Sequence, residues 1–344
     1  MKATYKKYIL DFKRPSGTSR GVLLKKETWF ILLEDKDSIG IGECGILRAL
    51  SFDDRPDYEE KLQWVCNNIH LGLDVLYKEL SDFPSIQFGL EQAFDSLYAE
   101  NPYVLYPSDF TSKEAPIAIN GLIWMGEKEY MKSQIIDKLN AGFTCIKLKI
   151  GAIDFETELD LLKYIREQFS EDDIEIRVDA NGAFSHDRAL ENLKRLSAFK
   201  LHSIEQPIRA GSWDVMASLC EVTPLPIALD EELIGITTFK RKQELIETIK
   251  PQYIILKPSL VGGIKGSLEW IQLAEKNRVE WWITSALESN IGLNAIAQFT
   301  FTLDNNMPQG LGTGALYTNN FDSPLIVKSG KLIYSNSGKW NFNL

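Results

Sequence analysis

The amino acids that are scarce in this chain set the first limits on its chemistry. It has four cysteines, and no two of them are spaced as Cys-x-x-Cys: they are Cys44, Cys66, Cys145 and Cys220. This scattered set is typical of reduced thiols rather than of a disulfide framework or a zinc site. The three histidines are isolated as well, so we expect neither a histidine-based catalytic triad nor a histidine metal cluster.

An excess of positive charge and long apolar runs are also lacking. The formal net charge of −10 at pH 7 argues against nucleic acid or an anionic membrane as a partner, because both require a basic surface. No apolar run is long enough to cross a bilayer, and residues 1–8 lack the apolar stretch of a signal peptide. We therefore expect a cytoplasmic protein whose partner is a small molecule. With 344 residues, of which 44% are hydrophobic, the chain can bury a large core and form two domains.

The first third of the chain is predicted to be an α+β domain. Its expected strands are residues 4–12, 28–33 and 40–45. Its expected helices are residues 57–79 and 86–100. Two prolines follow, and residues 106–115 have the composition of a linker. We place this domain at residues 1–110. Residues 320–344, which include a hairpin pattern around Ser329 and Gly330, are expected to return to it.

From residue 111 to residue 319 the pattern changes to short strands that alternate with helices. The expected strands are 117–123, 144–150, 175–178, 201–204, 226–229, 253–256, 280–284 and 309–311. Alternation of this kind predicts parallel pairing in an α/β fold. We therefore expect a modified (β/α)8 TIM barrel that could lack its last helix, capped by the α+β domain.

A charged residue lies at the end of several predicted barrel strands, where barrel enzymes carry their catalytic groups. Asp179, Glu205, Asp230 and Lys257 end strands three to six, about 25 to 30 residues apart. Each carboxylate alone could be a turn residue or a helix N-cap. Three carboxylates on neighbouring strands would converge at one end of the barrel and repel one another. A divalent cation would relieve that repulsion, and oxygen ligands favour Mg²⁺ or Mn²⁺ over zinc.

Two lysines on the second predicted strand face the same cluster. Apolar residues alternate with Lys147 and Lys149 between Thr144 and Gly151, so both amines lie on one face of the strand. By itself this pattern is typical of an edge strand with a solvated face. Beside three carboxylates, and with Lys257 across the barrel, it predicts amines on two sides of a substrate. Desolvation and nearby positive charge can lower the pKa of a lysine toward neutrality, which suits proton abstraction.

The order of these motifs resembles the enolase superfamily, in its muconate-lactonizing-enzyme-like branch. The motifs are Lys-x-Lys at 147–149, Asp-x-Asn at 179–181, Glu-Gln-Pro at 205–207, Asp-Glu at 230–231 and Lys-Pro at 257–258. Enolase-superfamily sites combine a lysine or histidine base with Mg²⁺. The resemblance covers essentially the whole chain and implies a reaction that begins with removal of a proton next to a carboxylate.

The resemblance implies a role for each matching residue. Asp179, Glu205 and Asp230 would be the Mg²⁺ ligands, with Mn²⁺ as an alternative ion, and Asn181 and Glu231 would support them.

The same resemblance assigns the amines. Lys149 would take the α-proton and then help a hydroxyl leave as water. Lys257 would stabilise the enediolate from the other face. Lys147 would add positive charge toward the substrate carboxylate.

Within that branch, further segments are similar to the o-succinylbenzoate synthase family of menaquinone (vitamin K2) biosynthesis. They are 17–21, 42–44, 50–51, 88–91, 284–292 and 309–313. That family dehydrates a succinyl-hydroxy-cyclohexadiene carboxylate (SHCHC) to o-succinylbenzoate, so the resemblance implies a carbon–oxygen lyase. Departures from the family pattern occur at 46–49, at Glu232 and at Gly312, and they concern the substrate pocket rather than the metal site.

The family's capping loops, here around 16–20 and 46–53, would close over the succinyl tail and exclude water. The candidate substrate contacts are Thr18, Arg20, Trp124, Ser285 and Gly310. Trp124 ends the first barrel strand and could equally be a packing residue.

Two other functions remain open. The same site serves N-succinylamino acid racemases and dipeptide epimerases, because all of these reactions begin with the same proton abstraction. An epimerase usually has an acidic anchor after strand eight, where this chain has Gly312 and Gly314. A barrel that only binds a ligand is the weaker alternative, because such a protein should have lost some of the site residues.

Overall fold

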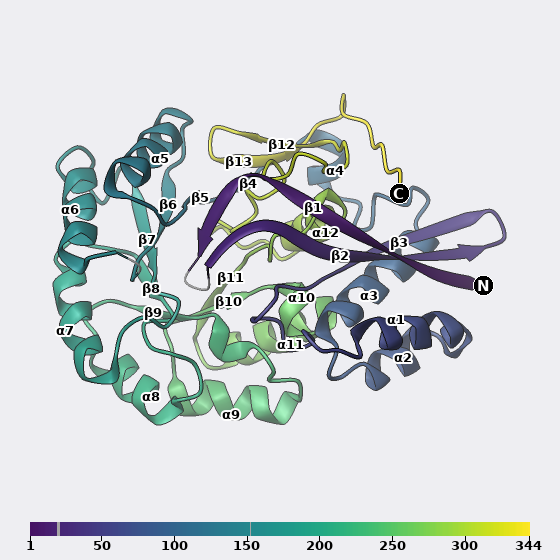
Figure 1. The fold of residues 1–344 in the computed structure, drawn as a ribbon, viewed down its shortest axis with the longest axis horizontal. Helices are drawn as coiled ribbons and strands as arrows, with labels where there is room; N and C mark the ends of the chain where they lie inside the picture. Colours follow the sequence, from purple (N-terminus) through teal and green to yellow (C-terminus); the bar gives the residue numbers. More distant parts are fainter. Residues whose placement is uncertain (19–20, 152) are drawn as a thin grey trace.

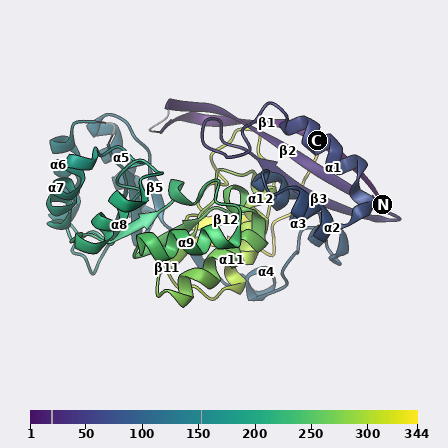
Figure 2. The same ribbon diagram turned by 90° about the horizontal axis from the view of Figure 1, so that it is seen from below.

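The computed structural model describes residues 1–18, 21–151 and 153–344. An antiparallel sheet and its helices lie against one side of a curled parallel sheet that is surrounded by helices (Figure 1). Figure 2, turned by 90°, shows β1, β2 and α1–α3 on one side of the ring of barrel helices. All four cysteines are buried free thiols, as the sequence predicts. No helix in the described ranges combines the length and apolarity needed to cross a membrane.

The N-terminal sheet has the order β1-β2-β3, and its first two strands are much longer than expected. Its strands are β1 (Lys2–Thr18), β2 (Gly21–Asp35) and β3 (Ser38–Gly45). β1 and β2 pair from one end to the other, with a register shift between Asp11 and Ser16. The prediction was too short because the hairpin extends beyond the buried core, where side chains such as Val22 and Leu24 are exposed and apolar alternation is lost.

Helices cover one face of this sheet. They are α1 (Tyr58–Asn67), the 3-10 turn η1 (Ile69–Leu71), α2 (Leu73–Glu79) and α3 (Pro84–Tyr98), with α4 (Asp109–Lys113) leading into the barrel. The single helix expected at 57–79 is wrong, because Gly72 has a φ of 78° and separates two helical segments. A Cβ on Gly42 of β3 would lie only 1.7 Å from the carbonyl oxygen of Gly89. Sheet and α3 therefore meet backbone to backbone.

The parallel sheet contains seven strands in chain order. They are β5 (Gly121–Ile123), β6 (Cys145–Lys149), β7 (Glu175–Asp179), β8 (Ser203–Glu205), β9 (Ile227–Leu229), β10 (Tyr253–Leu256) and β11 (Glu280–Ile283). The connecting helices are α5 (Lys128–Asn140), α6 (Phe155–Arg166), α7 (His186–Ser197), α8 (Trp213–Val222), α9 (Phe239–Ile249), α11 (Gly263–Lys276) and α12 (Asn290–Thr302). Two short helical turns, η2 (Glu231–Leu233) and α10 (Pro258–Val261), follow β9 and β10. The α/β barrel prediction is confirmed.

The expected eighth strand is reduced to isolated bridges that join the two edges of the sheet. Gly310 bridges to Thr284 after β11, and Gln309 bridges to Ile119 between β4 (Ile117–Ala118) and β5. The expected first strand, 117–123, is accordingly two short strands separated at this junction. The chain then leaves the barrel for a hairpin.

That hairpin consists of β12 (Leu325–Lys328) and β13 (Lys331–Tyr334), and it pairs with β4. The residues after it reach the N-terminal sheet, where the ring centroids of Phe342 and Phe30 are 5.3 Å apart. We retain the division into 1–110 with 320–344 and 111–319 as a proposal.

Candidate active site

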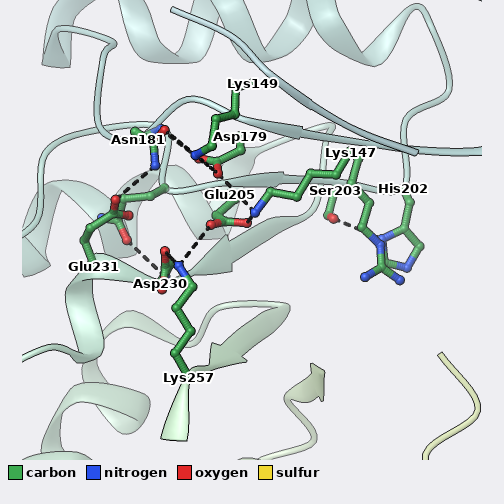
Figure 3. A network of polar contacts seen from close by, with 12 residues as sticks. Lys147, Lys149, Asp179, Asn181, His202, Ser203, Glu205, Asp230, Glu231 and Lys257 are labelled. Carbon is green, nitrogen blue, oxygen red and sulfur yellow. Dashed lines mark hydrogen bonds and ion pairs between the residues drawn. The ribbon is translucent and has the colours of Figure 1, made fainter. Parts of the chain in front are cut away.

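The barrel strands bring the charged residues of the sequence motifs to one end of the barrel interior. In β6, β7 and β8, Lys149 pairs with Asp179 and Asp179 with Glu205, so the three side chains lie at the same level. Asp230 and Lys257 follow β9 and β10 and point to the same place (Figure 3). The buried side chains of Ala228, Ile255 and Trp282 form an apolar cluster on alternate positions of their strands. Ala228 and Ile255 lie two residues before Asp230 and Lys257, so the same inward face of these strands carries an apolar layer below the charged end.

Amines bridge the carboxylates. The Nζ atom of Lys147 is 3.0 Å from Asp179 Oδ2 and forms a close ion pair with Glu205. The Nζ atom of Lys149 donates to Asp179 Oδ2 at 3.0 Å and to Asn181 Oδ1 at 2.9 Å. On the opposite side, Lys257 forms a close ion pair with Asp230. The site thus has amines on two sides of an acidic centre, in the arrangement that the motifs suggest.

Neighbouring polar residues hold these groups in place. Asn181 has a φ of 44°, and its Nδ2 donates to Glu231 Oε1 at 3.0 Å. Gln206 has a φ of 41°, and its Nε2 donates to Glu232 Oε2 at 2.9 Å. Glu232, a departure from the family pattern, therefore accepts a hydrogen bond from the side chain of the residue that follows Glu205. The left-handed backbone conformations of Asn181 and Gln206 make sharp turns after the strands. These turns leave the carboxylates of Asp179 and Glu205 inside the barrel.

Burial and charge shift the pKa values of the carboxylates in opposite directions. Burial opposes ionisation of Asp179, but Lys147 and Lys149 outweigh it and lower the pKa of Asp179. The pKa of Asp230 is lowered in the same way, chiefly by Lys257 acting against burial. Burial and the charge of Asp179 instead raise the pKa of Glu205.

Two of the amines in this centre have raised pKa values. Burial lowers the pKa of Lys147 and Lys257, but the surrounding carboxylates outweigh burial and raise both values. The nearest charged neighbours of these two amines are acids, which favour the protonated form.

The acidic centre suits a hard cation, although it is not a preformed metal cage. Within the described ranges no three His, Cys, Asp or Glu side chains are grouped closely enough to hold a metal, since the amines of Lys147 and Lys257 lie between the acids. Glu205 Oε1 is buried and has no hydrogen-bond partner in the described part of the chain. Three buried carboxylates, one with such an oxygen, form an oxygen donor set of the kind that Mg²⁺ and Mn²⁺ prefer.

A cavity of about 400 Å³ opens next to this centre. Of the predicted contacts, Trp124, Ser285 and Gly310 line it. The side chains of Thr18 and Arg20 lie outside the described part, although the backbone of Gly17 bridges to Met125 next to Trp124.

Most of the other residues that line the cavity are not among the predicted contacts; they include Leu23, Asn120, Leu287, Thr313 and Leu316. Most of these side chains are apolar and carry no chemical signature. Only their place in the fold brings them to the cavity.

A parallel barrel with acids and amines at the ends of its strands, covered by an antiparallel sheet, is the architecture of enolase-type enzymes. Residues 131–337 match the family model described as enolase C-terminal domain-like, and the chain belongs to that family. The chain is 46% identical to the o-succinylbenzoate synthase of Desulfotalea psychrophila, over 96% of this chain and 98% of that protein.

Solved structures agree with this assignment. The crystal structure of MenC from Desulfotalea psychrophila has a TM-score of 0.86 at 43% identity and covers 97% of this chain and 99% of that one. A substrate-liganded L-Ala-D/L-Glu epimerase from Bacillus subtilis has a TM-score of 0.80 at 19% identity and covers 99% and 98%. The epimerase is similar to this chain in fold alone, whereas the Desulfotalea psychrophila protein is similar in both fold and sequence.

Proposed function

We propose that this protein is an o-succinylbenzoate synthase, a lyase that removes water from SHCHC in menaquinone biosynthesis. The observation that carries the proposal is 46% identity, along nearly the full length of both chains, to a protein of that name. The site supports it, because Lys149 and Lys257 approach one acidic centre from two sides next to a cavity.

In the proposed reaction, Lys149 Nζ takes the proton from the ring carbon that bears the carboxylate, and the electrons of the C–H bond move into that carboxylate. Lys257 and Lys147 place positive charge near the enediolate oxygens. Lys149 then returns the proton to the departing hydroxyl as the C–O bond breaks, so that water leaves and the ring becomes aromatic. The hydrogen bonds from Lys149 to Asp179 and Asn181 fix the position of its Nζ for both transfers.

Asp179, Glu205 and Asp230 are the residues that would hold Mg²⁺, or Mn²⁺ in its place. When bound, the ion supplies positive charge that stabilises the anionic carboxylate of the intermediate. Support for this assignment comes from the oxygen donor set and from Glu205 Oε1, a buried oxygen that accepts no hydrogen bond from the described residues and lies 3.9 Å from Lys257 Nζ. Asn181 and Glu231 would hold this centre from behind. We further propose a cytoplasmic location and a small-molecule carboxylate as the partner.

The direct test is formation of o-succinylbenzoate from SHCHC by the purified protein, with and without EDTA. We expect turnover that EDTA abolishes and that added Mg²⁺ restores. Absence of product under saturating Mg²⁺ would reject the proposal.

Racemisation of N-succinylamino acids is the second candidate, because amines on opposite faces can exchange a proton with either enantiomer. Racemisation requires both lysines as proton carriers, whereas dehydration requires only Lys149. Hydrogen–deuterium exchange at the substrate α-carbon, measured with each lysine replaced singly, separates the two roles.

A further inference from the structure

A buried lysine outside the acidic centre takes no part in the proposed proton transfers. Lys26 lies in β2 with its side chain 4% exposed. Its Nζ has no hydrogen-bond partner among residues 1–18, 21–151 and 153–344. Removal of an ammonium group from water costs several kcal/mol unless an opposite charge compensates. A ligand that carries a negative charge would supply that compensation.

The amine lies on the face of the sheet that contacts the barrel. Thr28, two residues further along the same face, donates to Glu43, and Glu43 in turn accepts from the backbone of Ser289 at the start of α12. A Cβ added to Gly45 would lie 2.5 Å from Lys26 Nζ, so the amine is positioned over the end of β3. It therefore lies between the N-terminal sheet and the barrel.

Lys26 does not itself line the cavity, but residues close to it along the chain do. The loop after Gly45 contributes Leu47 and Leu50 to the cavity wall, and Leu23 contributes from β2 itself, three residues before Lys26. These leucines suit a short hydrocarbon chain, because apolar contacts favour the methylene groups of such a chain. A carboxylate at the end of that chain would need a cation on the sheet side of the cavity.

Among the described residues, which do not include Arg20, the cations that line the cavity are engaged or distant. Arg48 donates to Glu27 and to Asp54 at 2.6 Å each. The three barrel lysines are paired with the acids of the catalytic centre. Lys138 lines the cavity near Phe143, which precedes β6 and so marks the end of the barrel away from the acidic centre.

We propose that Lys26 binds the terminal carboxylate of the succinyl chain and thereby selects substrates that carry this second carboxylate. The inference rests on the proposed function, because both SHCHC and its product carry one carboxylate on the ring and one at the end of the chain. The ring carboxylate is directed to the acidic centre. The chain then extends along Leu23, Leu47 and Leu50, and its carboxylate reaches Lys26.

The test compares the wild type with Lys26→Met in two assays. For SHCHC turnover, we expect KM to rise 10- to 100-fold while kcat changes less than threefold, because the lost charge-assisted hydrogen bond lies far from the reacting carbon. For binding, the probes are o-succinylbenzoate and its analogue with a terminal amide. The wild type should prefer the carboxylate at least tenfold, Lys26→Met should show no preference, and Lys26→Arg should recover part of it.

Controls separate this role from a structural one. Lys25→Met removes an exposed neighbour 3.5 Å from Asp11 and should change neither assay. Without ligand, the Lys26→Met protein should have a melting temperature equal to or above that of the wild type, because a buried charge without a hydrogen-bond partner among the described residues has been removed. Lys26→Gln is measured in parallel as a second variant. A preference for the carboxylate that survives in both Lys26 variants, or that is lost instead in Lys138→Met, would overturn the inference. A wild type without turnover would reject the proposed function itself.

Discussion

The attachment of the N-terminal sheet to the barrel should depend on the buried carboxylate of Glu43. Its Oε1 accepts from Thr28 Oγ1 and from the backbone N–H of Ser289, both at 2.9 Å. Its Oε2 accepts from Ser289 Oγ at 2.6 Å and from the backbone N–H of Gly292 at 2.8 Å. The carboxylate thus satisfies free N–H groups at the start of α12, where negative charge is favoured.

The magnitude follows from these four hydrogen bonds. Glu43→Gln keeps the shape but places an NH₂ group against one hydroxyl, which can turn and accept, and against one backbone N–H, which cannot. One hydrogen bond to a charged group, worth about 1.5–3 kcal/mol, is therefore lost, and the free energy of unfolding should fall by about that amount. The opening between sheet and barrel should also weaken substrate binding, because Ser285 and Leu287 of the cavity wall immediately precede this junction.

The measurement is urea-induced unfolding followed by fluorescence and by circular dichroism. Glu34→Gln, on the exposed part of the same sheet, is the matched control and should change stability by less than about 0.5 kcal/mol. Combining Glu43→Gln with Ser289→Ala should cost less than the sum of the single changes, because the two residues share a bond. A Glu43→Gln protein within about 1 kcal/mol of the wild type would refute this explanation of docking.

Three further predictions concern the site and the cap. Mg²⁺ should raise the melting temperature of the wild type but not that of Asp179→Asn, and an equal shift in both would place the ion elsewhere. Lys149→Ala should abolish deuterium exchange at the substrate α-carbon, whereas Lys257→Arg should slow dehydration without abolishing exchange; normal dehydration in Lys257→Arg would contradict its electrostatic role. Burial raises the pKa of Asp53 to about 6 from 3.8 despite hydrogen bonds from Ser85. The folded protein therefore holds this proton more tightly than the unfolded one, and stability should fall by about 3 kcal/mol in total as pH rises from well below 4 to well above 6. Asp53→Asn, compared by unfolding at each pH, should lack this component, and identical pH profiles would disprove it.

The extended β1–β2 hairpin shows where local pattern fails as a guide. Strand prediction relies on buried alternation, and the outer part of this hairpin has little of it. Its pairing runs from Lys2 with Glu34 to Thr18 with Gly21, interrupted by the register shift between Asp11 and Ser16, and comes from backbone hydrogen bonds, which carry no side-chain signal. The helix expected at 57–79 failed for a related reason, because the apolar period continues through a glycine whose backbone turns away.

The sequence by itself was enough to predict the barrel and the charged residues at the C-terminal ends of its strands. Predicted strands two to six each end with a charged residue such as Asp179 or Lys257, and parallel strands must bring those ends to one edge. This information is local and repeats along the chain, so it can be recognised before the structure is known.

Tertiary structure alone decided how the charges are paired and what surrounds the cavity. Lys147 and Lys257 lie between the acids, and Lys26 is buried without a partner among the described residues. Such facts depend on distances between segments far apart in the chain, and electrostatic energy and desolvation depend on those distances rather than on the order of residues.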